Sequence, residues 1–305
     1  MKQHATVRFL SLAFAIGWLF QCLAIKFGSQ GAGRGWLIAA MWAPLLASLF
    51  IREARSSVWS GFKRVRISYW VVALAAGWMF AILQQLLLWV TNGGQWNARN
   101  FPLNADHSGI NEVNHLAMTL GVGSQGFLWF AMNILVSVSL GSLILMFAAI
   151  GEEAGWRGFL QETLVERLGW IKSTLLIGLI WGLWHLPLNL AGYNDAQHPI
   201  LQALIIFQIH TISMSFVLAL LMRKTRSIWV VALAHAANNT IQSGPLLLSS
   251  NWFADQLTSI LASILVGAAA FALLYRRTAS YSVQVRDLPG QAVWDPVSQS
   301  QLARE

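Results

Sequence analysis

A small number of side chains able to perform acid-base chemistry interrupt the long apolar segments of this chain. Burying a charged or titratable group in such a segment is costly, commonly about a few kcal/mol on membrane-insertion scales, so each is a candidate functional residue until a partner explains it. The groups with this placement are Glu152, Glu153, His185, His210 and His235, and the polar residues Asn238 and Asn239 accompany His235.

The two carboxylates continue an apolar run that we expect to be helical. Glu153 and Arg157 are four residues apart, which puts both side chains on one helix face, where an ion pair can form. Glu152 is turned about 100° away from Glu153. Its carboxylate can therefore face the interior of a helix bundle, where a desolvated carboxylate is suited to act as a general base. The alternative is an ordinary charged helix end at the membrane surface.

His185 lies two residues before Pro187, and a proline inside a helix frees a backbone carbonyl and can bend the helix. A bent helix suits a water-containing cavity. The alternative is a core histidine hydrogen-bonded to a neighbouring helix. Asn189, one turn further, shares its face and could hold the ring. His210 has few polar neighbours at helical spacing, so we interpret it as structural.

His235 and Asn239 are one helical turn apart, so both side chains can point at the same site. Ala236 and Ala237 between them allow another helix or a substrate to approach closely. Histidine and asparagine are good donors to a developing oxyanion. The alternative is a structural polar contact between helices.

Together these segments supply a base, a place for a water and oxyanion donors, which are the parts that a hydrolase needs. Serine or cysteine catalysis is less attractive, because the single cysteine, Cys22, lies far from the cluster in sequence. In addition, no serine stands in a nucleophile-like motif beside the histidines. The sequence therefore favours a hydrolase that acts through an activated water.

The elements that must position these residues are membrane-spanning helices. Of the 305 residues, 56% are hydrophobic and only 10% are charged, a composition outside the range of soluble domains. A helix needs about 20 apolar residues to cross a hydrocarbon layer of roughly 30 Å. We therefore predict an all-α, polytopic transmembrane helical bundle of about eight spans. The runs lie near residues 9–25, 36–51, 69–90, 127–150, 173–191, 200–222, 228–248 and 257–275.

One transmembrane domain is expected over residues 1–277, with the chemical motifs in its core at 127–248. The polar tail, 278–305, is expected to be cytoplasmic and disordered. Lys and Arg are held on the cytoplasmic side during insertion, and a cytoplasmic N-terminus leaves only three of the 20 basic residues outside, namely Lys26, Arg34 and Arg99. Both termini are thus predicted to be cytoplasmic.

The net charge of +8 does not indicate a nucleic-acid partner, because the basic residues sit in short clusters between apolar runs and not on one face. The partner expected from composition is the lipid bilayer. The longest loop, roughly 92–126, is predicted to lie outside and contains His107, Glu112 and His115. Their spacing specifies no metal geometry, so we interpret them as residues of a solvated loop.

Three motifs in this order resemble those of the CPBP family of intramembrane proteases. This is the family of the type II CAAX prenyl protease and of bacteriocin-processing and self-immunity proteins, also called ABI. The resemblance covers about residues 127–248, and the family's second motif usually begins with Phe where this chain has Trp181. The motifs are Glu152-Glu153-x-x-x-Arg157, Trp181-x-x-x-His185 and His235-x-x-x-Asn239.

The resemblance implies an eight-helix bundle and an endopeptidase in which Glu152 and His185 activate a water. It further implies that His235 and Asn239 stabilise the oxyanion, while the supporting residues are Glu153 and Arg157. If a metal is used, the resemblance implies zinc held by Glu152, His185 and His235 with a water in the open position. A metal-free glutamate mechanism fits equally well.

The leading hypothesis is an endopeptidase of the cytoplasmic membrane, whose cavity opens toward the cytoplasmic half and whose peptide or protein substrate the sequence does not identify. The alternative is a non-catalytic membrane scaffold, carrier or bacteriocin-immunity protein of the same fold. A transporter is disfavoured, because it would be expected to show inverted repeats or interrupted paired helices, and the sequence indicates neither.

Overall fold

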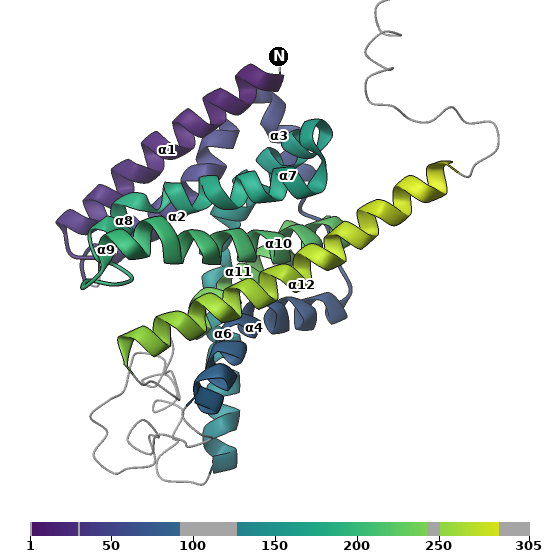
Figure 1. Cartoon of the computed structure of the whole chain (residues 1–305). Coiled ribbons are helices and arrows are strands. Elements are labelled where there is room, and N and C mark those ends of the chain that lie inside the picture. The colour runs from purple at the N-terminus through teal and green to yellow at the C-terminus, as the bar shows by residue number, and fades with distance from the viewer. Residues whose placement is uncertain (1, 30, 92–126, 243–250, 287–305) are drawn as a thin grey trace, which may run out of the picture.

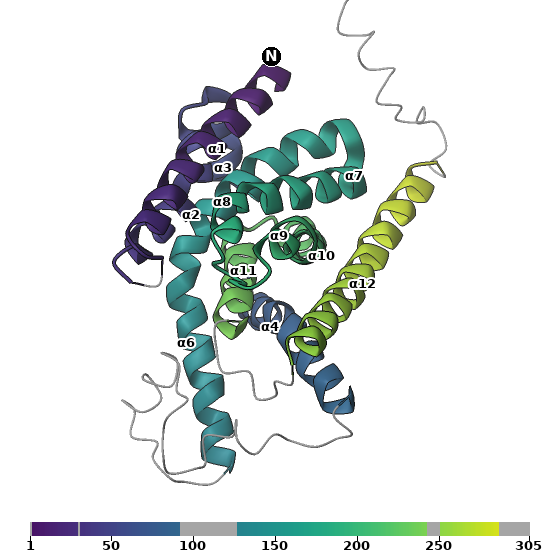
Figure 2. The ribbon, with the colours of Figure 1, turned by 60° about the vertical axis from the view of Figure 1, so that its left-hand side comes forward.

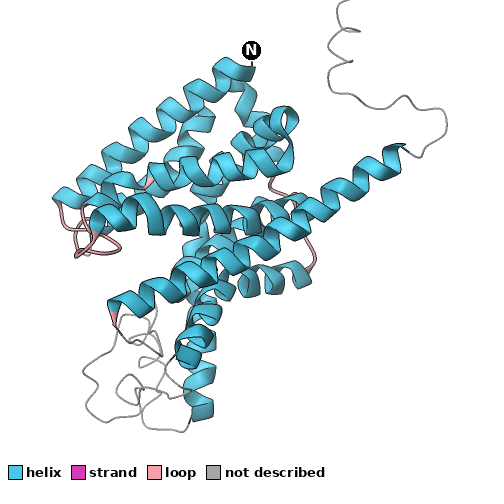
Figure 3. Ribbon diagram, viewed as in Figure 1, coloured by secondary structure: helices cyan, strands magenta, loops and turns pink. Residues whose placement is uncertain are grey.

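The computed structural model describes residues 2–29, 31–91, 127–242 and 251–286, and every regular element within these ranges is a helix (Figures 1 and 3). Two of the elements are π-helical, η2 and η3. In chain order the elements are α1 (Lys2–Lys26), α2 (Arg34–Leu49), α3 (Arg52–Ser60), α4 (Ile67–Thr91), α6 (Phe127–Glu153), η2 (Ala154–Leu160), α7 (Gln161–Trp184), α8 (Leu186–Leu190), α9 (Pro199–Leu201), η3 (Gln202–Ile206), α10 (Phe207–Thr225), α11 (Ile228–Gln242) and α12 (Trp252–Arg286).

Five helical segments of the described chain are long and apolar enough to cross a membrane. The pair α2 and α3, bent by 117° at a short break, raises this number to six if it forms one span. The prediction of an all-α, multi-pass membrane bundle is therefore confirmed. The five segments are His4–Lys26, Ile67–Thr91, Val138–Trp184, Pro199–Thr225 and Trp252–Thr278.

The expected number of spans, eight, exceeds the number of long apolar helices in the described chain, five or six, for local reasons. The segment Val138–Trp184 joins two expected spans through η2 and through a kink at Gly169, whose φ of 71° suits a residue without a side chain. Only 15 residues of α11 belong to the described helix, fewer than a span needs. The number of spans and the cytoplasmic side of both termini remain predictions.

Helix α11 lies at the centre of the bundle, packed against α6, α4 and α10 (Figure 2). Its residues 230–238 are all buried. On the side of α4, a Cβ added to Gly77 would lie 2.3 Å from the carbonyl oxygen of Ala234 and 2.6 Å from the Cβ of Ala237. The close helix approach expected from the alanines of this segment is therefore present. His235 stands in the middle of this buried stretch.

Helix α12 crosses the bundle obliquely and extends past the expected domain boundary at residue 277 to Arg286 (Figure 1). The remainder of the predicted tail, 287–305, lies outside the described residues. The same holds for the loop 92–126 with His107, Glu112 and His115. The division into a membrane domain and a disordered tail stays a prediction.

Candidate active site

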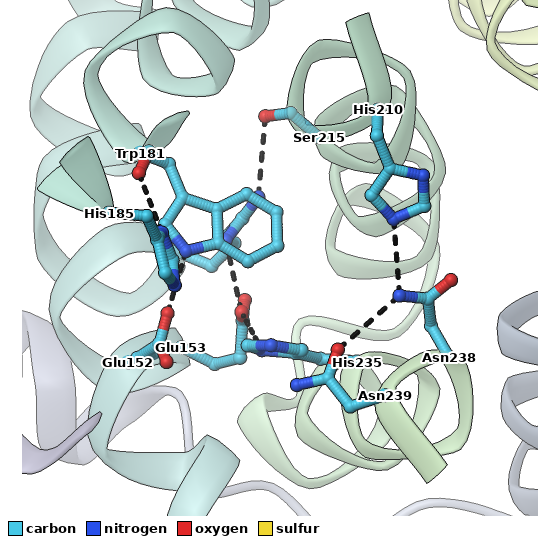
Figure 4. A network of polar contacts seen from close by, with 10 residues as sticks. Glu152, Glu153, Trp181, His185, His210, Ser215, His235, Asn238 and Asn239 are labelled. Carbon is cyan, nitrogen blue, oxygen red and sulfur yellow. Dashed lines mark hydrogen bonds and ion pairs between the residues drawn. The ribbon is translucent and has the colours of Figure 1, made fainter. Parts of the chain in front are cut away.

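The three sequence motifs meet in the middle of the bundle (Figure 4). Glu152 and Glu153 are the last residues of α6, Trp181 lies in the last turn of α7, and His235 comes from the middle of α11. Residues separated by more than 80 positions in sequence are thus brought into hydrogen-bond contact, because His235 bonds Glu153 across 82 residues.

Glu153 links the first motif to the third. Its Oε1 atom accepts a hydrogen bond from Nη1 of Arg157 at 3.0 Å and lies 2.9 Å from Nδ1 of His235. The ion pair expected from the four-residue spacing is therefore present. Nη2 of Arg157 also donates to Oγ of Ser215 on α10 at 3.3 Å. A buried charge needs such pairing, because desolvation otherwise opposes its ionised form.

The carboxylates are not an exposed, charged helix end. Glu152 is 1% exposed, and Glu153 and Arg157 are 0% exposed. The alternative interpretation of this segment was therefore wrong. The helix here also changes its winding, because η2 begins at Ala154 and contains Arg157. Single π-helical turns are rare and occur frequently at functional sites.

Trp181 links the second motif to the first. Its Nε1 donates to Oε2 of Glu152 at 2.6 Å, with both side chains buried. The guanidinium carbon of Arg157 lies 4.7 Å from the centre of the indole ring, and the His235 ring packs edge-on at 5.0 Å. Trp181 therefore contacts an acidic, a basic and an imidazole group of the other two motifs.

His185 occupies the break between α7 and α8. Its backbone, with φ −84° and ψ 3°, leaves the helical conformation two residues before Pro187, so the expected bend is present. The carbonyl of Trp184, at the end of α7, accepts hydrogen bonds from two side chains of α1, Trp18 Nε1 at 3.1 Å and Gln21 Nε2 at 2.9 Å. Helix α1 thus binds the end of α7 at this break through two side-chain hydrogen bonds.

The His185 ring is held by backbone and aromatic contacts. Its Nδ1 lies 2.9 Å from the carbonyl oxygen of Trp181, and the Trp184 and Phe207 rings pack edge-on at 4.7 and 5.0 Å. Asn189 does not hold the ring, contrary to expectation, because its Oδ1 accepts from Nδ2 of Asn194 at 2.6 Å. The short loop after α8 competes for this amide, which spacing alone does not reveal.

Asn239 is part of a second group of polar side chains. Nδ2 of Asn238 donates to Oδ1 of Asn239 at 3.3 Å and lies 3.2 Å from Nε2 of His210. Nδ1 of His210 in turn lies 3.2 Å from Oγ of Ser263 on α12. His210 therefore belongs to the surroundings of the site, which sequence reasoning missed, since its partners lie on other helices.

The candidate zinc ligands are Glu152, His185 and His235. Within the described ranges no three His, Cys, Asp or Glu side chains are arranged to hold a metal ion. One oxygen of Glu152 is moreover engaged by Trp181. A zinc site would need these ligands at about 2.0–2.2 Å from one point, and the use of a metal stays a prediction.

A cavity of about 470 Å³ opens between α1, α3, η2 and α7, and Glu53, Glu162 and Glu166 are among its lining residues. None of the four candidate catalytic side chains is among the residues that line it. The cavity is therefore a separate feature of the described structure. The hydrated cavity expected around the site itself stays a prediction.

Fold and site define a helical, multi-pass membrane protein with a buried cluster of carboxylate, imidazole and carboxamide groups. Residues 119–241 match the family model of Type II CAAX prenyl endopeptidase Rce1-like proteins. This range contains all six candidate residues of the three motifs. This match, over less than half of the chain, agrees with the resemblance to the CPBP family of CAAX proteases that the motifs indicated.

A segment of the chain is also similar to CAAX prenyl protease 2 of Methanococcus maripaludis. The two are 40% identical over 57 residues, which is 19% of this chain and 21% of that protein. The similarity thus spans about a fifth of the length of this relative.

Proposed function

We propose that this chain is an intramembrane endopeptidase of the cytoplasmic membrane that hydrolyses a peptide bond with an activated water. The observation that carries the proposal is the contact of the three motifs with one another, through Glu153 with His235 and through Trp181 with Glu152. If these groups had only a structural role, a second carboxylate, Glu152, would not be required beside Glu153, whose charge Arg157 already balances.

In this proposal Glu152 is the general base. Its Oε2 accepts the Trp181 N–H, so Oε1 is the oxygen available to bind the water and take its proton. Nδ1 of His185 donates to the Trp181 carbonyl, which can only accept, so this nitrogen carries a proton. In the neutral ring Nε2 is then an acceptor that orients the same water. The proton held by Glu152 passes to the departing amine when the peptide C–N bond breaks.

His235 and Asn239 are the proposed donors to the oxyanion that forms when water adds to the carbonyl. Nδ1 of His235 donates to the Glu153 carboxylate, and Nε2 can donate only when the ring carries its second proton. The Glu153 carboxylate, which Nδ1 contacts, stabilises this doubly protonated ring. A fixed donor aimed at the oxyanion is commonly worth about 3–4 kcal/mol in the transition state.

The substrate class is proposed from the similarity to CAAX prenyl protease 2. A quenched, farnesylated CAAX peptide is therefore the first probe for the purified protein in lipid vesicles. We expect Glu152→Gln to lower turnover of this probe at least about a hundredfold, given the usual contribution of a general base. Its thermal unfolding should match that of the wild type.

Comparative proteomics of membranes containing the wild-type or the Glu152→Gln protein tests the same proposal without a chosen substrate. The variant membranes should accumulate an uncleaved precursor. Unchanged turnover in the variant, together with no accumulated precursor, would reject the assignment. If alanine variants at Glu152, His185 and His235 also retained the cell phenotype, a non-catalytic scaffold or immunity protein would be favoured instead.

We further propose that the water is activated without a bound metal. The support is the geometry of Glu152, His185 and His235, which form no three-ligand group. Treatment with 1,10-phenanthroline, followed by removal of the chelator, should leave turnover of the peptide unchanged. Loss of activity that added zinc restores, with one zinc per chain by elemental analysis, would contradict this proposal.

A further inference from the structure

A line of polar side chains connects the proposed oxyanion donor Asn239 to two helices that contribute none of the three motifs. Asn238 and Asn239 lie on α11, His210 on α10 and Ser263 on α12. The order of contacts is Asn239 Oδ1, Asn238 Nδ2, His210 Nε2, His210 Nδ1 and Ser263 Oγ (Figure 4). Asn238 and Ser263 are both buried.

The donors and acceptors of this line can be assigned from chemistry. Nδ2 of Asn238 is a donor with two hydrogens, and Oδ1 of Asn239 can only accept. The second hydrogen meets Nε2 of His210, so this nitrogen is the acceptor and the proton of the ring lies on Nδ1. Nδ1 then donates to Oγ of Ser263. All members of the line are satisfied by one neutral tautomer of His210.

The same assignment orients the carboxamide of Asn239. Its oxygen is turned to Asn238, so its amide nitrogen is turned to the opposite side. In Figure 4 this nitrogen lies on the side of Glu152, and His235 stands one helical turn before Asn239 on the same face. A carboxamide rotated by half a turn would present its oxygen to an oxyanion, which repels it.

We propose that Asn238 and His210 are positioning residues, which hold the Asn239 carboxamide with its N–H groups toward the reacting carbonyl. This inference rests on the proposed peptidase function, in which Asn239 donates to the oxyanion. It differs from a simple link between helices, because such a link needs only a hydrogen bond of either polarity. Positioning requires an acceptor at Nε2 and a donor at Asn238.

The variants that test this polarity are chosen at His210. Glutamine keeps one acceptor and one donor at the end of a side chain of similar length, so His210→Gln should preserve the line. Leucine keeps the volume and removes both polar atoms. The matched control is Phe80→Leu, because the Phe80 ring contacts His210 edge-on at 5.0 Å without taking part in the hydrogen bonds. Asn238→Leu provides an independent break.

With the farnesylated CAAX peptide as probe, His210→Leu and Asn238→Leu should lower kcat about ten- to a hundredfold and leave KM within about twofold. Loss of an oxyanion donor acts on the transition state alone and therefore appears in kcat. His210→Gln and Phe80→Leu should keep kcat within about threefold of the wild type. Glu152→Gln, measured in parallel, must be inactive for the proposed function to stand.

An NMR measurement tests the inference without a substrate and can also be made on variants of low stability. The side-chain amide signals of Asn239, identified in ¹⁵N-asparagine protein by their loss in Asn239→Ala, should keep their shifts in His210→Gln and move in His210→Leu. If Glu152→Gln is inactive while His210→Leu and Asn238→Leu keep the kcat of the wild type, the inference is overturned and the proposed function stands. The inference is also overturned if the Asn239 signals do not move in His210→Leu, or if they move as far in His210→Gln as in His210→Leu.

Discussion

Oε1 of Glu153 is shared between Nη1 of Arg157, at 3.0 Å, and Nδ1 of His235, at 2.9 Å. One buried oxygen thus joins a cation on the π-helical turn after α6 to an imidazole on the central helix. Because this carboxylate is surrounded by protein, its interactions with both partners are little screened by water. The stability of the bundle and the geometry of the site therefore depend on the same atom.

Removing one member of this pair is expected to be more harmful than removing both. Arg157→Met leaves the Glu153 charge buried without its cation, which should lower the free energy of unfolding by about 3–5 kcal/mol. The double variant Glu153→Gln/Arg157→Met carries neither charge and should recover much of that loss. Unfolding in detergent, followed by tryptophan fluorescence, measures both. Equal stability of Arg157→Met and the wild type would contradict the expectation.

The Trp181 to Glu152 hydrogen bond predicts an effect on catalysis. Trp181→Phe keeps the ring contacts with Arg157 and His235 but removes the N–H that fixes Oε2 of the carboxylate. A hydrogen bond to a charged group is worth about 1.5–3 kcal/mol, so kcat for the CAAX peptide should fall roughly 10- to 100-fold. The fold should be retained, as judged by circular dichroism.

The matched control for this variant is Trp184→Phe. Nε1 of Trp184 also donates a buried hydrogen bond, but to the backbone carbonyl of Ala13 at 2.9 Å. This control should lose stability and keep its kcat, because the bond does not reach Glu152. Equal kcat losses in the two variants would mean that Trp181 acts through packing and not through the carboxylate.

Local chemistry was predictable from the sequence wherever one helix carries both partners. The Glu153 and Arg157 pair follows from their spacing along a helix, and the bend at His185 follows from Pro187. The apolar runs likewise identified the helices, because in lipid every backbone group must form its hydrogen bond within its own helical segment.

Contacts between helices were not predictable in this way. The bond from Trp181 to Glu152 spans 29 residues, and that from Asn238 to His210 spans 28. They depend on which helix faces are apposed and on the π-helical turn, which rotates the residues after Glu153 relative to a regular helix. A single sequence carries no signal for either, so His210 was interpreted without its partners and Asn189 was given the wrong one.

The approach of α4 to α11 predicts that Gly77 does not tolerate a side chain. A Cβ at Gly77 would lie 2.3 Å from the carbonyl oxygen of Ala234, so Gly77→Ala must push the helices apart. We expect a loss of about 1–3 kcal/mol in the free energy of unfolding. Gly35→Ala in α2 is the control, because nothing lies within 4 Å of its added Cβ. It should be neutral or stabilising by up to about 1 kcal/mol. Equal unfolding temperatures of the two variants would argue against this packing.

A loop residue outside the candidate spans, Asp195, predicts a dependence on pH. Asp195, in the loop between α8 and α9, accepts hydrogen bonds from Nε1 of Trp252 at 2.6 Å and from the backbone N–H groups of Gln197 and His198. Burial acts to raise the pKa of Asp195, but these hydrogen bonds together lower it below its ordinary value of 3.8. The His198 ring lies over Trp252 at 3.9 Å, so this loop is fastened to the start of α12.

Because the pKa of Asp195 is lower in the folded protein, its contribution to stability is fully present above pH 3.8 and is lost as the pH falls through the lowered folded value. Amide hydrogen exchange at residues 191–199 and 252–258 should therefore accelerate in the wild type over that acidic range, relative to the intrinsic rates. Asp195→Asn keeps the shape without the titrating group, so its exchange should be faster than that of the wild type at pH 6 and free of the acidic step. Trp252→Phe should show a smaller acidic step, because the backbone donors to Asp195 remain. An acidic step that persists unchanged in Asp195→Asn would assign the titration to another group.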